Sequence, residues 1–156
     1  MAAAGKFKRY DIFAKWMADG TFDLDANTIK CALFLSTSNA NTLTNTNSLL
    51  ANLTNQHANA NGYTTGGVTV AATWVEAAGV ATFDVADAVW TASGGSIIAR
   101  FAVLYASGTL NGHVDPLIAV CLLDTAPADV TATTGNTLTI QINASGVFTV
   151  SAGQVD

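Results

Sequence analysis

Oxygen-bearing side chains alternate with apolar residues near the start of the chain, in the segment FDLDANTIKCALFL. Asp23, Asp25 and Asn27 have the spacing with which a calcium loop places its first three ligands. An EF-hand loop also needs glycine at its sixth position and glutamate at its twelfth, and these positions hold Thr28 and Phe34. We therefore predict that the polar residues form a turn leading into a buried strand; the alternative is a metal site of another kind.

Residues that could carry catalysis are few. Both histidines, His57 and His113, lie in segments rich in turn residues, and the one conceivable base–carboxylate pair is His113 with Asp115. Asp84 and Asp87 resemble the carboxylate pair of a glycosidase, but their spacing alone is weak evidence. Neither a nucleophile elbow nor a phosphate-binding loop with its lysine is present. We expect no catalytic residue, no metal and no cofactor, and therefore not an enzyme.

The cysteines and tryptophans all lie in apolar surroundings. We predict that Cys31 and Cys121 are buried free thiols that act as small hydrophobes. Trp16, Trp74 and Trp90 are interpreted as core or interface anchors, with a carbohydrate platform as the alternative.

Charge is scarce and unevenly distributed. Only 11% of the residues are charged, and the net charge is −5, which argues against a nucleic-acid partner. The first 30 residues hold five of the six basic residues, whereas Arg100 is the one basic residue after them, against seven acidic ones. A positive N-terminal segment on an acidic body suits docking on an acidic neighbour, and a solvated helix face is the alternative. No apolar run reaches the roughly 18 residues of a membrane span.

The elements that must position these residues are mostly strands. Apolar spacing in KFKRYDIFAKWMA predicts a helix over 6–18, and a buried strand is predicted over 29–35. The polar stretch 36–67 is expected to be a long loop, mobile without a partner, with a short helix over 48–56. Further strands are predicted over 68–75, 80–83, 88–91, 96–106, 117–123, 137–142 and 146–150. This spacing predicts a mainly β, single-domain β-sandwich of jelly-roll type that spans 1–156.

The order of several short motifs resembles a family of small virion structural proteins of tailed bacteriophages. After the N-terminal helix, the matching segments are GTFDLDANTIKCAL (20–33), GYTTGG (62–67), ATFDVADAVW (81–90), ARFAVLY (99–105), PLIA (116–119) and LTIQINASGVFTV (138–150). The similarity covers most of the chain, and the segment 36–61 is its least family-like part.

This resemblance implies a structural role in the virion. We expect a capsid decoration or cement protein that binds the major capsid protein, bridges capsomers and forms a homotrimer. A neck, tail or fibre-associated subunit is the alternative, and a carbohydrate-binding adhesin module is the alternative of another class. The expected location is the particle surface after synthesis in the host cytoplasm, with no membrane partner. Candidate contact residues are Phe7, Tyr10, Phe13, Trp16, Lys6, Lys8, Arg9, Leu49, Leu50 and Leu53.

Overall fold

The computed structural model describes residues 5–125 and 128–151. This part of the chain is mainly β, with one short α-helix and several antiparallel sheets, and no sheet closes into a barrel. The helical elements are α1 (Phe13–Ala18) and the 3₁₀ turn η1 (Leu50–Asn52). The strands are β1 (Lys8–Arg9), β2 (Ile29–Phe34), β3 (Val68–Val70), β4 (Ala72–Ala77), β5 (Val80–Val85), β6 (Ala88–Thr91), β7 (Ile97–Ala99), β8 (Phe101–Ala106), β9 (Thr109–Leu110), β10 (His113–Val114), β11 (Leu117–Leu122), β12 (Val130–Ala132), β13 (Thr137–Ile140) and β14 (Phe148–Ser151).

The middle of the molecule is a five-stranded antiparallel sheet in the order β1-β11-β8-β2-β3. Its three inner strands are almost continuous apolar runs: IKCALF in β2, FAVLYA in β8 and LIAVCL in β11. Every residue of β8 is buried, so protein covers both faces of this strand. The strand predicted over 29–35 is confirmed as β2, and its apolar composition reflects this two-sided burial.

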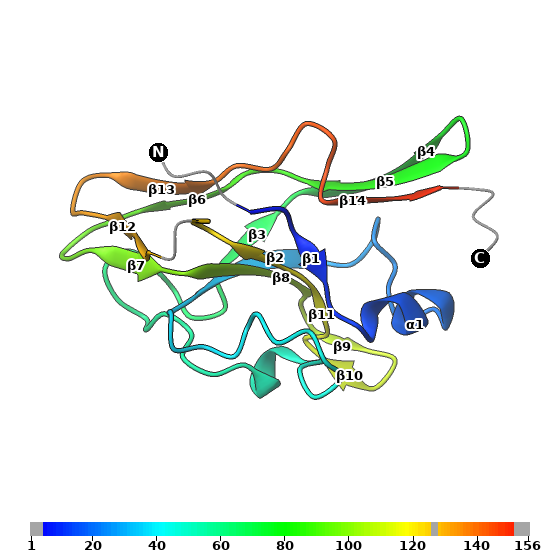
Figure 1. Cartoon of the computed structure of the whole chain (residues 1–156), viewed down its shortest axis with the longest axis horizontal. Helices are drawn as coiled ribbons and strands as arrows, with labels where there is room; N and C mark the ends of the chain where they lie inside the picture. The colour runs from blue at the N-terminus through cyan, green and yellow to red at the C-terminus, as the bar shows by residue number, and fades with distance from the viewer. Residues whose placement is uncertain (1–4, 126–127, 152–156) are drawn as a thin grey trace.

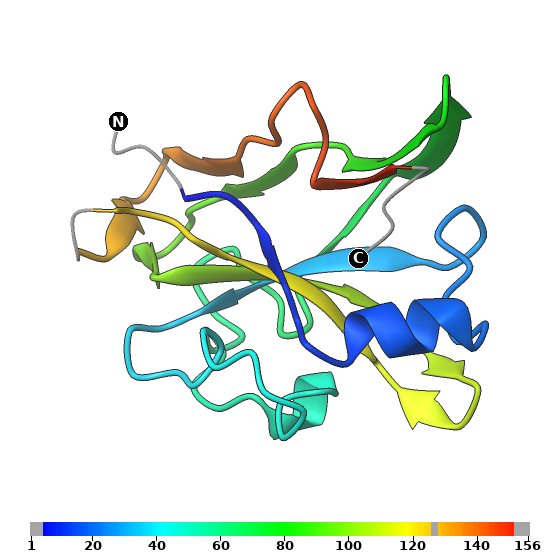
Figure 2. The ribbon, with the colours of Figure 1, turned by 45° about the vertical axis from the view of Figure 1, so that its right-hand side comes forward.

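A second layer of strands covers one face of the central sheet (Figures 1 and 2). In this layer β5 lies between β4 and β14, and β6 pairs with β13. Since β6 follows β5 closely and β13 precedes β14, the two pairs form one long antiparallel ribbon. The larger hydrophobic core lies between the layers and includes Phe83, Ile97, Leu104 and Ile118, each 0% exposed.

Residues 36–67 cover the other face of the central sheet, below it in Figure 1. A second core there contains Phe34, Val103 and Leu117, with Leu50 and Leu53 packed against it. The long loop expected over 36–67 is confirmed, since η1 is its one named element, and its mobility without a partner stays a prediction. A few leucines and a network of side-chain hydrogen bonds connect this loop to the sheet. The helix predicted over 48–56 is reduced to the single turn η1.

Asparagine side chains supply much of that network. Asn47, 4% exposed, donates from Nδ2 to the carbonyl oxygens of Asn39 and Thr42, both at 2.9 Å. Asn39 in turn accepts the N–H of Thr54 at 2.8 Å and donates to the Asn52 carbonyl at 3.0 Å. These amides satisfy backbone groups that have no partner strand, so a polar sequence forms an ordered covering layer.

The helix predicted over 6–18 is wrong in its first half. Residues 5–10 are extended along β11: the Gly5 N–H donates to the Leu122 carbonyl at 2.7 Å, and the Tyr10 N–H donates to the Ile118 carbonyl at 3.1 Å. Pairing with a sheet edge satisfies the backbone of this segment, and the helix starts only at Phe13. Across 5–125 and 128–151, no helix has the length and apolar character needed to cross a membrane.

Most other predicted strands are present, some of them divided. The segment 68–75 splits into β3 and β4, and the segment 96–106 splits at Arg100 into β7 and β8. The turns of the β4–β5 and β9–β10 hairpins contain consecutive residues with positive φ, Ala78–Gly79 and Asn111–Gly112, as tight two-residue hairpins require. The strands that the sequence pattern missed are β1, β9, β10 and β12, because two or three residues carry too little periodicity.

Candidate interaction groove

The segment that resembles a calcium loop is held by hydrogen bonds within the chain. Asp23 Oδ1 accepts the N–H of Ala26 at 3.1 Å, and Asn27 Oδ1 accepts the N–H of Asp23 at 2.8 Å. Asp25 Oδ1 accepts the N–H of Trp74 at 2.9 Å and so attaches the turn to β4. The described residues contain no group of three or more His, Cys, Asp or Glu that could hold a metal ion.

The two histidines occupy different environments. His57 is buried, with its Nδ1 2.8 Å from the Ala58 carbonyl oxygen and its ring 5.0 Å from that of Tyr63. The ring of His113 stacks on Trp16, with centroids 4.1 Å apart. Asp115 Oδ1 accepts the N–H of Gly108 at 2.7 Å, so its carboxylate and the His113 ring have different partners.

The remaining candidate acids and thiols also have structural contacts. Asp84 Oδ1 accepts the N–H of Val85 at 2.9 Å, whereas Asp87 Oδ1 accepts the N–H of Ile142 at 2.8 Å and joins the two halves of the long ribbon. Cys31 and Cys121 are free and buried, as predicted. Burial raises the pKa of the Cys31 thiol, and it raises that of Cys121 to about 11, so both sulfurs stay protonated at neutral pH.

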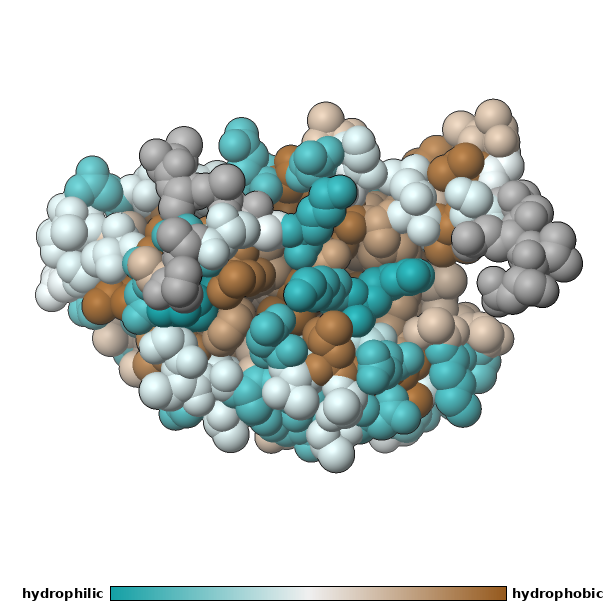
Figure 3. All heavy atoms as spheres, viewed as in Figure 1, coloured by the Kyte–Doolittle hydropathy of each residue, from teal (hydrophilic) through white to brown (hydrophobic). Residues whose placement is uncertain are grey.

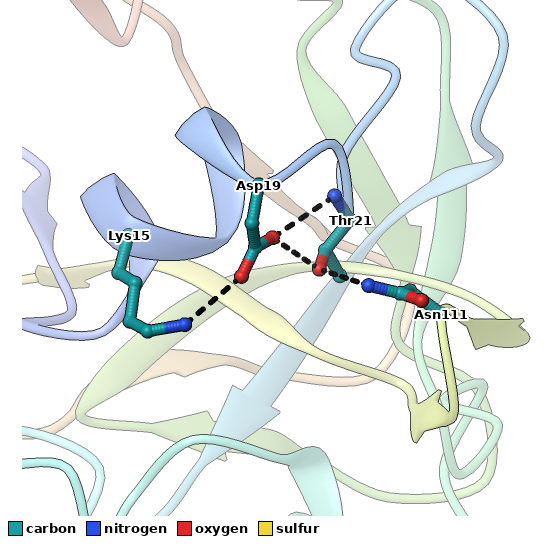
Figure 4. Close-up of polar contacts among 4 residues, drawn as sticks. All are labelled: Lys15, Asp19, Thr21 and Asn111. Carbon is teal, nitrogen blue, oxygen red and sulfur yellow. Dashed lines mark hydrogen bonds and ion pairs between the residues drawn. The ribbon is translucent and has the colours of Figure 1, made fainter.

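A polar cluster fixes the β9–β10 hairpin against α1 (Figure 4). Asp19 accepts from the Lys15 ammonium at 3.1 Å and from the Thr21 hydroxyl at 2.7 Å, and Asn111 Nδ2 lies 3.4 Å from the Thr21 hydroxyl oxygen. The hydrogen bonds from Thr21 and then Lys15 lower the pKa of Asp19. This cluster holds the helix end and the hairpin together, beside the stacked rings of Trp16 and His113.

The candidate contact residues are divided by the fold. Tyr10, Phe13 and Trp16 are 1%, 0% and 6% exposed, so they belong to the cores of the chain, and their expected place on a contact surface is corrected. Leu50 and Leu53 are half-buried against the second core, and Leu49 packs against the first.

The other candidates lie on residues 5–10, the N-terminal edge segment, which runs along the edge of β11. Phe7 is half-buried, whereas Lys6, Lys8 and Arg9 are exposed. This segment therefore presents basic side chains at the surface while its one remaining aromatic ring faces the core.

A groove of about 1600 Å³ runs along the side where the two strand layers are open. Its walls are the N-terminal edge segment and, opposite, the residues from β12 to β14. Its lining includes buried apolar side chains from three strands: Cys121, Ala132, Leu138 and Ile140. Figure 3 shows apolar residues exposed between the two layers, with hydrophilic residues beside them.

The basic residues of the N-terminal edge segment, Lys6, Lys8 and Arg9, form no ion pair with the described part of the chain. The two ion pairs found in residues 5–125 and 128–151 are Lys15–Asp19 and Arg100–Asp129. The Arg9 guanidinium instead lies 5.2 Å from the ring centroid of Phe148, which lines the β14 end of the groove. Lys6 and Arg9 thus give the groove two positive charges on a chain of net charge −5.

The sequence pattern indicates one wall of this groove and misses the other. The basic N-terminal residues are conspicuous in the sequence, but the residues of 137–149 are predicted only as strands. The alternation of polar and apolar residues in TLTI (β13) indicates a half-buried strand. It does not indicate that one edge of this strand has no neighbouring strand. Comparison of the chain with known protein families, with curated proteins and with solved structures finds no match.

Proposed function

We propose that this chain is a structural subunit of a bacteriophage virion, and that it decorates the capsid as a cement protein. On this proposal it binds the major capsid protein, bridges neighbouring capsomers and acts as a homotrimer. Its contribution is multivalent: linked subunits that each bind weakly reach a total affinity higher by about 10²–10⁴.

The observation that supports the proposal is the position of the family-like motifs in the fold. The segments 20–33, 81–90, 99–105 and 138–150 contain or overlap β2, β5, β6, β8 and β13, the strands around the larger core. The segments that resemble the family therefore lie in the strands that form the core, and not in a single loop. The side chains with catalytic potential are engaged in turns and packing, which agrees with a binding role.

The fold is part of the same proposal. We interpret the two strand layers as the sheets of a β-sandwich, with residues 36–67 as an additional cover. Jelly-roll connectivity stays a prediction.

Immunogold labelling of intact particles of the encoding phage tests the role. Label distributed over the head is the expected result, whereas label confined to the neck or tail would assign the chain to that part of the virion. Particles that carry no label would reject a surface role. For the trimer, light scattering of the purified chain is expected to give about 48 kDa, three times the 16.0 kDa of one chain; a mass of one chain would reject it.

A carbohydrate-binding adhesin is the second candidate, and one cleft favours it. Trp74 is half-buried beside a cleft of about 490 Å³ that it shares with Met17, Phe22 and Asp23. An indole next to a carboxylate is a suitable surface for a sugar ring. Trp16 and Trp90, at 6% and 3% exposed, belong to the core. Quenching of tryptophan fluorescence by sugars, lost in Trp74→Ala, would support this candidate.

A further inference from the structure

The groove has free strand edges on both sides. In the described residues β13 pairs only with β6, and β1 pairs only with β11. The Asn136 carbonyl accepts the N–H of Ala92 at 2.9 Å, so it points toward β6. Backbone groups of successive residues in an antiparallel strand point to opposite sides, which leaves the N–H and C=O groups of Thr137 and Thr139 directed away from β6. An extended peptide laid along this edge would find hydrogen-bond partners there.

The interior of the groove suits alternate apolar side chains. Leu138 and Ile140 of β13 face the core, while Thr137 and Thr139 are exposed. Val130 and Phe7 are half-buried beside the same core. A strand added at this edge would direct every second side chain toward these apolar residues and the others toward solvent.

The charges of the groove select the sign of the outward side chains. Lys6 lies in the wall opposite β13, and the Arg9 guanidinium reaches Phe148 of the lining. Neither residue forms an ion pair among the described residues. Nearby carboxylates are already engaged, since Asp129 pairs with Arg100 and Asp87 binds the N–H of Ile142. Acidic side chains on an added strand would complement the basic wall.

We infer that the groove binds an extended, acidic segment of a partner polypeptide, which pairs with the free edge of β13 and places its carboxylates next to Lys6 and Arg9. The inference rests on the proposed function in one respect, namely that the partner is a subunit of the same particle. It assigns the site by the chemistry of the segment: alternating apolar and acidic residues in a strand conformation.

Fluorescence anisotropy with synthetic peptides tests this site on the full chain. The probe is a fluorescein-labelled octapeptide of alternating valine and aspartate, with two controls: alternating valine and lysine, and the acidic peptide with proline at alternate valines, which lacks N–H donors. We expect saturable binding of the acidic peptide at low salt, weakened by salt, and no binding of either control. The inference would be overturned if the acidic peptide showed no saturable binding up to about 1 mM. A dissociation constant of this size corresponds to a standard binding free energy of about −4 kcal/mol.

Variants locate the binding on the groove. The double variant Lys6→Glu/Arg9→Glu is expected to weaken binding at least tenfold, whereas Lys15→Glu, on the exposed side of α1, leaves it within twofold. Thr139→Pro removes one edge donor without touching the ladder to β6 and is also expected to weaken binding at least tenfold, once circular dichroism shows that the variant is folded. If Lys6 and Arg9 only keep the edge from pairing with other chains, binding would be equal in wild type and double variant, and the inference would be rejected.

Two further outcomes would assign the groove or the chain a different role. Concentration-dependent self-association that Thr139→Pro abolishes, without peptide binding, would assign the groove to a second copy and reject the acidic segment. Immunogold label on the head without peptide binding would leave the decoration role standing and reject the groove.

Discussion

The Tyr10 hydroxyl joins the N-terminal segment to the covering layer of residues 36–67. It donates to the Ala40 carbonyl oxygen at 2.7 Å, and the two residues are 1% and 0% exposed. Replacing Tyr10 by phenylalanine deletes this buried hydrogen bond, worth about 1 kcal/mol net, and leaves the carbonyl without that donor, at a penalty of about 1–3 kcal/mol. We expect Tyr10→Phe to lower the free energy of unfolding by about 2 kcal/mol.

Urea denaturation followed by tryptophan fluorescence measures this change. For a slope of about 2 kcal/mol/M, the midpoint is expected to fall by about 1 M urea at unchanged slope. The control is Thr44→Ala in the same segment, where the Thr44 and Thr46 hydroxyl oxygens lie 2.8 Å apart on the exposed surface. This control is expected to change stability by less than about 0.5 kcal/mol. Equal midpoints for the two variants would refute the view that the polar segment is an integral layer of the fold.

Two further predictions concern a close backbone approach and alkaline pH. Gly67 has φ +75°, and a Cβ there would overlap the Cys31 carbonyl oxygen, whereas Gly94 has φ +77° and open space around it. In thermal unfolding, Gly67→Ala should lower the free energy of unfolding by more than about 3 kcal/mol, whereas Gly94→Ala should lower it by only about 1–2 kcal/mol, from backbone strain. Equal decreases for the two variants would contradict the overlap at Gly67. Burial raises the pKa of Tyr63 from 10.0 to about 12 and that of Cys121 from 9.0 to about 11. As the pH rises, the unfolded chain loses these protons before the folded chain does. The stabilising contribution of the two groups is therefore fully present below pH 9 and decreases between pH 9 and 12, by up to about 1.4 kcal/mol per pH unit for each group. Urea midpoints that stay constant from pH 8 to 11 would contradict this prediction.

The strands of the interior could be predicted because their composition alone determines their environment. The runs in β2, β8 and β11 are apolar on both faces, and such runs are stable only between two layers of protein. Hairpin turns such as Asn111–Gly112 were visible because few residues accept positive φ. In these places local preference and tertiary structure agree.

Prediction failed where a distant segment decides the conformation. Residues 6–9 have an acceptable helical pattern, but the unpaired edge of β11 satisfies their backbone more completely. In 36–67 the loop itself could be predicted, but not its packing on the central sheet through three leucines and the amides of Asn39 and Asn47. The groove depends on edges at 5–9 and 137–149, and no local pattern reports that two segments so far apart in sequence border one opening.

The burial of Tyr10, Phe13 and Trp16 also changes how a contact surface can be tested. Removal of the whole N-terminal segment would delete core side chains together with surface charges, so a loss of binding would report unfolding. Exposed residues of the same segment, Lys6 and Lys8, offer substitutions that leave the core intact.

On our proposal the chain binds its particle through the groove wall that contains Lys6, and zero-length carbodiimide cross-linking of intact particles tests this contact. This reagent joins amines only to carboxylates in direct contact, and mass spectrometry identifies the linked peptides. We predict cross-links from Lys6 to aspartate or glutamate in a capsid subunit, and none from Lys30, which is half-buried in the central sheet. Particles that contain the chain but yield no link from Lys6 to another polypeptide would contradict this binding mode.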